Sequence, residues 1–186
     1  MRAIILALLF IGGLVGAAAA ADIDIGPAVG TAIPTPFAVH DPAEELQTFA
    51  DLAGPSGVVM VFVRSASWCP YCIQQLREIE SVNAPLKERG YRLVSVSYDS
   101  ADVLTTFIKK YGVTYMMTSD RGSAMIDAFK IRDPQYGPNS KAYGVPKPAI
   151  FVVDRGGIVR AKLAEDGYKT RPPSQAIIEA IDSLKK

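Results

Sequence analysis

Apolar runs alternate with segments of helical periodicity along most of the chain. The unbroken apolar run 57–63 is typical of a strand buried on both faces. The segment 70–89 then places apolar residues at helical spacing, with Pro85 expected to kink or shorten the helix and Gly90 expected to end it. The pattern therefore predicts a central strand that passes directly into a helix.

The same patterns predict the remaining elements and their order. We expect a short edge strand at 36–40, a strand or helical turn at 46–52, strands at 91–98 and 113–118, helices after Ser100 and Asp120, a hairpin of strands at 149–153 and 158–163, and a helix around 177–184. The segment 132–147 has prolines, glycines and tyrosines without an apolar period, which indicates a functional or mobile loop. This order predicts an α/β sandwich whose first strands are parallel, with an antiparallel hairpin at one edge.

Residues 1–21 have a different composition from the rest. Arg2 precedes an almost wholly apolar stretch that ends in a run of alanines, as in a secretory signal peptide. An uncleaved membrane anchor is the alternative, because the apolar stretch is only slightly shorter than a membrane span. We expect an exported protein, periplasmic if the source is a Gram-negative bacterium, in which residues 22–186 form one domain.

Charge and cysteine content narrow the possible functions. Without residues 1–21 the chain has equal numbers of basic and acidic residues, and it has no basic stripe that would indicate nucleic-acid binding. We also expect no stable membrane insertion after the signal is cleaved. An exported chain whose only two cysteines lie in one C-x-x-C does not use disulfides as staples, which favours a working dithiol.

The two cysteines, Cys69 and Cys72, lie where the predicted strand meets the predicted helix. Pro70 suits the first helical position, so Cys69 faces the unpaired N–H groups of the helix N-terminus. Thiols in such places have pKa values lowered to roughly 3.5–7.5. Cys72 lies one turn deeper and could attack a mixed disulfide on Cys69. A structural disulfide would gain little from so short a loop, and a zinc site would need more ligands than the single histidine, His40, adds.

Two segments resemble a known family. The run 66–72, Ala-Ser-Trp-Cys-Pro-Tyr-Cys, resembles the thioredoxin motif A-x-W-C-x-x-C. The run 148–157, Pro-Ala-Ile-Phe-Val-Val-Asp-Arg-Gly-Gly, is similar to the P-x-x-F-hydrophobic-hydrophobic-D-x-x-G segment of exported thioredoxin-like proteins and the AhpC/TSA, or redoxin, group. The resemblance covers roughly residues 34–185. It implies a thioredoxin-like three-layer sandwich, with a mixed central sheet and helices on both faces, and thiol–disulfide chemistry without a cofactor or metal.

The resemblance also implies a substrate-binding surface. Pro148 would be the cis-proline opposite the cysteines, with Pro146 as the competing candidate, and the backbone at Lys147 and Pro148 would pair with the substrate. Trp68, Pro70 and Tyr71 would line the contact, although an aromatic at position 68 could equally be core packing.

The chain departs from the family patterns at several positions. Val63 stands where thioredoxins have a buried aspartate, so proton transfer at Cys72 would need water or another group. Phe62, Ala66 and Pro148 stand where the peroxiredoxin branch has its proline, threonine and arginine. The groups that polarise a peroxide are therefore missing.

Three functions compete for this cysteine pair. The first is an exported thiol–disulfide oxidoreductase acting on protein thiols or disulfides, with an exported or membrane redox partner. The alternative is a thiol peroxidase with Cys69 peroxidatic and Cys72 resolving, in which Arg64 could replace the missing arginine, although its place at a strand end indicates a surface residue. The third is a Cu(I) module using both cysteines and a methionine from 116–117, which are more often strand core.

Overall fold

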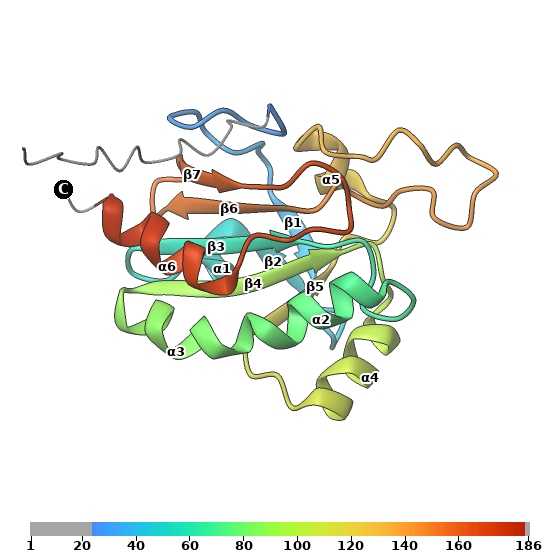
Figure 1. Ribbon diagram of the computed structural model, residues 1–186, viewed down its shortest axis with the longest axis horizontal. Helices are drawn as coiled ribbons and strands as arrows, with labels where there is room; N and C mark the ends of the chain where they lie inside the picture. Colours follow the sequence, from blue (N-terminus) through green and yellow to red (C-terminus); the bar gives the residue numbers. More distant parts are fainter. Residues whose placement is uncertain (1–23, 185–186) are drawn as a thin grey trace, which may run out of the picture.

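A single mixed sheet organises the fold of residues 24–184, the part of the chain that the computed structural model describes (Figure 1). The predicted signal peptide, residues 1–21, lies outside the described residues. The strands are β1 (Ala38–His40), β2 (Leu46–Thr48), β3 (Gly57–Phe62), β4 (Tyr91–Ser97), β5 (Met116–Ser119), β6 (Ala149–Asp154) and β7 (Val159–Leu163). The helices are α1 (Phe49–Leu52), α2 (Pro70–Glu78), α3 (Glu80–Glu88), α4 (Ala101–Tyr111), α5 (Ala124–Ala128) and α6 (Ser174–Ser183).

The strand order is β2-β1-β5-β4-β3-β6-β7, with β3 near the middle. Strands β3, β4 and β5 are parallel neighbours, and β6 joins β3 antiparallel before turning back as β7. The predicted parallel strands and the antiparallel hairpin at one edge are both confirmed. Because β3 is paired on both sides, its carboxyl end lies at the centre of one edge of the sheet, and the cysteine motif follows directly.

Each face of the sheet carries its own apolar core. Val59 and Val61 of β3 belong to the core that α2, α3, α4 and α6 cover, whereas Val58, Met60 and Phe62 belong to the core that α1 and α5 cover. Figure 1 shows α2, α3 and α4 along one side of the sheet. Burying each such side chain contributes about 1.5–3 kcal/mol, which explains why β3 reads as a continuous apolar run. The predicted three-layer arrangement is confirmed.

The long helix predicted over 70–89 is two helices. The chain breaks at Ile79, whose N–H still reaches the carbonyl of Gln75 at 2.9 Å, while the N–H of Val82 bonds the carbonyl of Ile79 at 3.1 Å. Pro85 lies inside α3 rather than at the break. A proline crowds the carbonyl four residues before it and cannot bond it, so the distortion falls on the N-terminal side of the proline.

The predicted edge strand at 36–40 is β1, but it is not at the edge. β2 pairs with it on the outside, with Val39 opposite Gln47, and β5 lies on its other side. The ambiguous segment 46–52 contains both alternatives, because β2 leads directly into α1.

Of the two predicted caps, Ser100 occupies the N-cap of α4 without a side-chain bond. Asp120 precedes the N-cap residue of α5, which is Ser123, but its carboxylate accepts two of the backbone N–H groups of the helix.

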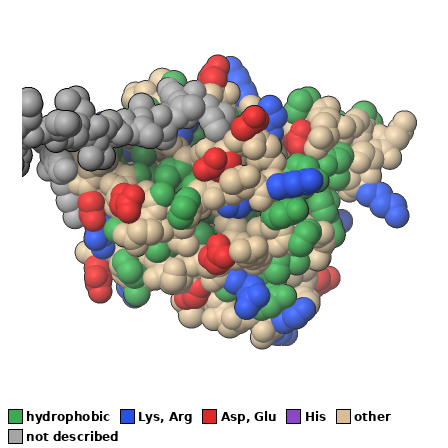
Figure 2. Space-filling model, in the orientation of Figure 1, with side chains coloured by type: hydrophobic (Ala, Val, Ile, Leu, Met, Phe, Trp, Pro, Cys, Tyr) green, Lys and Arg blue, Asp and Glu red, His purple; other side chains and the backbone are tan. Residues whose placement is uncertain are grey.

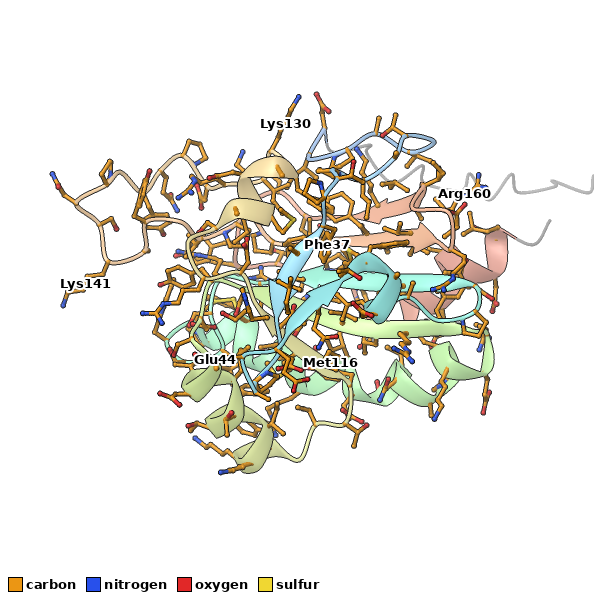
Figure 3. All side chains as sticks on the ribbon, turned by 180° about the vertical axis from the view of Figure 1, so that it is seen from behind. Phe37, Glu44, Met116, Lys130, Lys141 and Arg160 are labelled. Atoms are coloured by element: carbon orange, nitrogen blue, oxygen red, sulfur yellow. A yellow bond between two sulfur atoms is a disulfide. The ribbon has the colours of Figure 1, made fainter. Side chains whose placement is uncertain are left out.

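The segment 132–147 projects from the sheet as an extended loop, and Figure 3 shows Lys141 at its outer end. Its base is closed by backbone bonds: the N–H of Asp133 donates to the carbonyl of Val145 at 2.9 Å, and the N–H of Lys147 donates to the carbonyl of Ile131 at 2.7 Å. These bonds fix the direction in which the chain enters β6. Within residues 24–184, none of the helices has the length and apolar character needed to cross a membrane.

Candidate active site

The cysteine pair lies at the N-terminus of α2, as the sequence predicts. Cys69 is the N-cap residue, Pro70 begins the helix, and Cys69 Sγ accepts the N–H of Cys72 at 3.3 Å. The two sulfurs form a disulfide across a Cα–Cα distance of 5.2 Å. Cys69 is 2% exposed and Cys72 is fully buried, so Cys69 is the sulfur nearer to solvent. The helix-terminal N–H groups favour a thiolate at Cys69 once the bond is reduced.

A buried carboxylate holds the loop that leads from β3 to Cys69. Asp99 accepts the hydroxyl of Ser65 at 2.7 Å, the N–H of Ala66 at 2.7 Å and the hydroxyl of Ser97 at 2.9 Å. Asp99 was not among the residues predicted from the sequence. Its position was a usable signal, because it follows β4, a parallel neighbour of β3, and the carboxyl ends of such strands meet at one edge of the sheet.

Arg64 is buried against aromatic rings, and the prediction of a surface residue is wrong. It is 3% exposed, and its guanidinium carbon lies 5.2 Å from the ring centre of Trp68, 4.9 Å from that of Tyr136 and 4.1 Å from that of Tyr168. One of its nitrogens donates to the hydroxyl of Tyr136 at 2.5 Å, whereas Nε has no hydrogen-bond partner. The aromatic faces stabilise the cation away from water.

Arg171 reaches the inner cysteine from the segment before α6. Its Nη2 donates to Cys72 Sγ at 3.5 Å. Burial, together with the charge of Arg64, lowers the pKa of Arg171 to about 10, so the guanidinium is still charged at neutral pH. No sequence pattern pointed to this contact, because Arg171 follows Cys72 by 99 residues in a segment without periodicity. The thioredoxin aspartate position, Val63, is fully buried and apolar.

The predicted contact residues lie around the disulfide. Trp68 is 44% exposed and Tyr71 is 36% exposed, which favours the contact surface over core packing for Trp68. The indole N–H of Trp68 donates to the hydroxyl of Tyr98 at 3.0 Å, so the ring is held in place although much of it is exposed. Pro70 is also exposed. Figure 2 shows hydrophobic side chains gathered on the side of the molecule where the loop 132–147 projects.

The prediction of a cis peptide bond before Pro148 is wrong. Among the described residues the cis bond precedes Pro36, and those before Pro146 and Pro148 are trans. The hydrogen bond from the N–H of Lys147 to the carbonyl of Ile131 keeps the backbone extended as it enters β6. A trans peptide bond before Pro148 continues this extended backbone without a turn. Lys147 is exposed and Pro148 is buried.

Lys147 and Pro148 are linked to the site through Tyr168. Both line a cavity of about 230 Å³ together with Tyr168. The ring of Tyr168 also packs edge-on against Tyr71, with 6.1 Å between ring centres. Tyr168 therefore connects the segment before β6 with the helix that carries the cysteines.

The remaining candidate residues lie in ordinary structural positions. His40 is exposed. Met117 is 1% exposed in the core, whereas Met116 is 39% exposed at the start of β5, where Figure 3 labels it. Across residues 24–184 there is no group of three or more His, Cys, Asp or Glu side chains placed to hold a metal ion.

A disulfide at a helix N-terminus, after the central strand of a thioredoxin-like sheet, defines a thiol-based oxidoreductase. Comparison with known proteins identifies the family. The chain belongs to the AhpC/TSA family, whose model matches residues 29–162. The chain is an oxidoreductase enzyme of this family, as the predicted resemblance implied.

Individual relatives point to two branches. A thiol-disulfide oxidoreductase ResA of Oceanobacillus iheyensis is 30% identical over 146 residues, covering 75% of this chain and 70% of the relative. A chloroplastic peroxiredoxin Q of Sedum lineare is 27% identical over 153 residues, covering 82% and 77%. Among solved structures, peroxiredoxin Q of Xanthomonas campestris has a TM-score of 0.70 at 18% identity, covering 85% of this chain and 99% of that one. Peroxiredoxin 6 of Arenicola marina has a TM-score of 0.73 at 20% identity, covering 86% and 74%. These structural similarities show the fold.

Proposed function

We propose that this protein is a thiol–disulfide oxidoreductase that exchanges electrons with protein thiols and disulfides through Cys69 and Cys72. The observation that carries the proposal is the disulfide within one helical turn, beside the exposed rings of Trp68 and Tyr71. The two sulfurs that together accept or donate two electrons lie in one chain, and the aromatic rings offer a surface for a polypeptide partner. The similarity to ResA proteins supports this choice.

The exchange passes through a mixed disulfide. In the reducing direction, the Cys69 thiolate attacks one sulfur of the substrate disulfide, forms a bond to it and releases the other substrate sulfur as a thiolate. Cys72 then attacks Cys69, so the Cys69–Cys72 bond forms and the bond to the substrate breaks. Two electrons pass to the substrate, whose thiolates take protons from water. The reverse sequence oxidises a substrate dithiol.

The positions that would distinguish a peroxidase support the same choice. Phe62 is fully buried in the core, Ala66 has no hydroxyl, and Pro148 has no charge. A peroxide needs positioned donors to polarise its O–O bond, and losing one such donor typically costs a factor of about 100–1,000 in rate. Disulfide exchange does not depend on these donors, because a thiolate sulfur leaves without such help.

A thiol peroxidase is the second candidate, with Cys69 oxidised to a sulfenic acid that Cys72 resolves. The observation that favours it is Arg64, which is buried beside Trp68 where a cation could act on a bound peroxide. The similarity to peroxiredoxin Q points the same way. In Arg64, however, the hydrogen bond to Tyr136 and the surrounding rings already engage much of the guanidinium.

Trapping of mixed disulfides tests the proposal. Cys72→Ser removes the resolving thiol, so protein partners should accumulate on Cys69 as stable mixed disulfides on a non-reducing gel. Cys69→Ser is the matched control, since it also leaves one thiol but should trap none. Equal trapping by the two variants would contradict the assigned roles.

A rate comparison separates the two candidates. The reduced protein should reduce a model protein disulfide readily and should react with hydrogen peroxide only about as fast as an ordinary low-pKa thiol. Stopped-flow oxidation followed through Trp68 fluorescence measures the second rate. Peroxide oxidation several orders of magnitude faster than that of a free thiolate, together with weak disulfide exchange, would establish the peroxidase instead.

The proposed function includes an exported location. The apolar start of the chain and the similarity to ResA proteins support export, with an exported or membrane protein as redox partner. We place the substrate along Trp68, Pro70, Tyr71, Lys147 and Pro148. N-terminal sequencing of the protein after secretion checks both the export and the cleavage near residue 21.

A further inference from the structure

The guanidinium of Arg171 is fixed at the sulfur of Cys72 by bonds on both sides. Nη2 donates to Cys72 Sγ at 3.5 Å, and Nε donates to Oε1 of Gln75 on the next turn of α2 at 2.9 Å. Nη1 donates to the backbone carbonyls of Tyr168 and, at 2.8 Å, of Thr170. The side chain therefore cannot leave the sulfur without breaking bonds to both α2 and its own loop.

This cation has no carboxylate partner among residues 24–184, where the ion pairs are Arg89–Asp182, Arg132–Asp127 and Arg160–Asp154. The disulfide that it touches is neutral. A second buried guanidinium, that of Arg64, lies close enough for its charge to act on Arg171. The oxidised protein thus holds, at the disulfide, a positive charge without a carboxylate partner, and the charge of Arg64 acts on the same guanidinium, an arrangement that favours an anion there.

The other charged groups around Cys72 do not cancel this effect. Lys169 and Glu78 share a shallow surface pocket with Arg171 and oppose one another in charge. Asp99 accepts bonds from Ser65 and Ala66 in the loop before Cys69 rather than from Arg171. On α2 itself, Gln75 is neutral. The group that directly faces the inner sulfur is therefore a cation.

We propose that Arg171 stabilises the thiolate of Cys72 in the reduced protein, making the buried sulfur a ready nucleophile. This inference rests on the proposed function, in which Cys72 resolves the mixed disulfide. A buried thiol in apolar surroundings resists ionisation, and a donated N⁺–H bond to the sulfur offsets that resistance. In the resolving step the Cys72 thiolate bonds to Cys69 Sγ, the bond between Cys69 and the substrate breaks, and the substrate thiolate takes a proton from water.

Titration of a single thiol tests the inference directly. In a Cys69→Ser background, ultraviolet thiolate absorbance reports Cys72 alone. Arg171→Met should raise the titration midpoint of Cys72 by about one pH unit, a tenfold fall in its acid dissociation constant. Lys169→Met is the matched control: it removes a positive charge from the same loop, at an exposed side chain, and should leave the midpoint unchanged. An equal midpoint in the Arg171 and Lys169 variants would overturn the inference.

A second measurement uses both cysteines. Stabilising the thiolate favours the reduced form, so Arg171→Met should shift the equilibrium with glutathione about tenfold toward the disulfide, or about 30 mV. Arg171→Lys keeps the charge on a slightly shorter side chain, and should restore part of both shifts even if the Met variant folds poorly. No shift in either variant would refute the role of Arg171. Neither measurement needs a protein substrate, so failure of the proposed function would appear separately, in the trapping experiment.

Discussion

Asp99 offers the sharpest test of how the fold supports the site. Its carboxylate is 6% exposed and accepts three bonds, from Ser65, Ala66 and Ser97, at 2.7–2.9 Å. Replacing it with alanine leaves buried donors without an acceptor. A hydrogen bond to a charged group contributes about 1.5–3 kcal/mol, but the three bonds share one carboxylate whose own burial is costly. We therefore expect Asp99→Ala to lower the free energy of unfolding by about 3–4 kcal/mol.

Asp99→Asn is the informative companion. An asparagine oxygen can occupy the position of Oδ2 and accept the N–H of Ala66 and the hydroxyl of Ser97. Its NH₂ group then faces Ser65, whose hydroxyl can rotate to accept. The geometry survives without the charge, so we expect a loss of only about 1–1.5 kcal/mol.

Urea unfolding of the oxidised proteins measures both effects. Asp102→Ala is the control, because Asp102 is exposed in the first turn of α4 and its loss should cost no more than about 1 kcal/mol. The rate of protein disulfide reduction should fall about tenfold in Asp99→Ala, since the loop before Cys69 loses its anchor. An Asp99→Ala protein within about 0.5 kcal/mol of wild type would refute the reasoning.

Three further outcomes are expected. In the reduced protein, a thiol-directed alkylating agent should modify Cys69 well below pH 8, and should modify Cys72 much more slowly because Cys72 is fully buried. Mass spectrometry gives the order of modification, and modification of Cys72 before Cys69 would reverse the assignment of nucleophile and resolving thiol. Gly57→Ala should destabilise the fold by more than about 3 kcal/mol in urea unfolding, because φ at Gly57 is +146° and an added Cβ would lie 2.0 Å from a backbone oxygen. Gly137→Ala is the control: an added Cβ there has no other atom within 4 Å, so this variant should stay within about 1 kcal/mol of wild type. Trp68→Ala should weaken protein disulfide reduction about tenfold while reduction of a small disulfide stays nearly unchanged, since the exposed ring contacts only a large partner; an equal loss on both substrates would assign the ring to the chemistry.

The cysteine site shows which features local sequence determines. The apolar run of β3, Pro70 at the first helical position and the spacing of Cys69 and Cys72 are enough to place the cysteine pair at a helix N-terminus. Helical and alternating periods likewise predicted most of the elements, and the turn residues 154–157 predicted the hairpin. These features succeed because each depends on residues within one or two turns of chain, where backbone geometry and burial leave few choices.

The environment of the disulfide depended on the tertiary structure. Arg64 looked like a surface residue because its burial depends on Tyr136 and Tyr168, which come from distant loops. Arg171 had no periodic pattern around it, yet the fold brings it to Cys72. The trans bond before Pro148 likewise follows from the pairing of the chain ahead of β6. A side chain in an irregular segment acquires its role from what packs against it, and that is decided by contacts between residues far apart in the sequence.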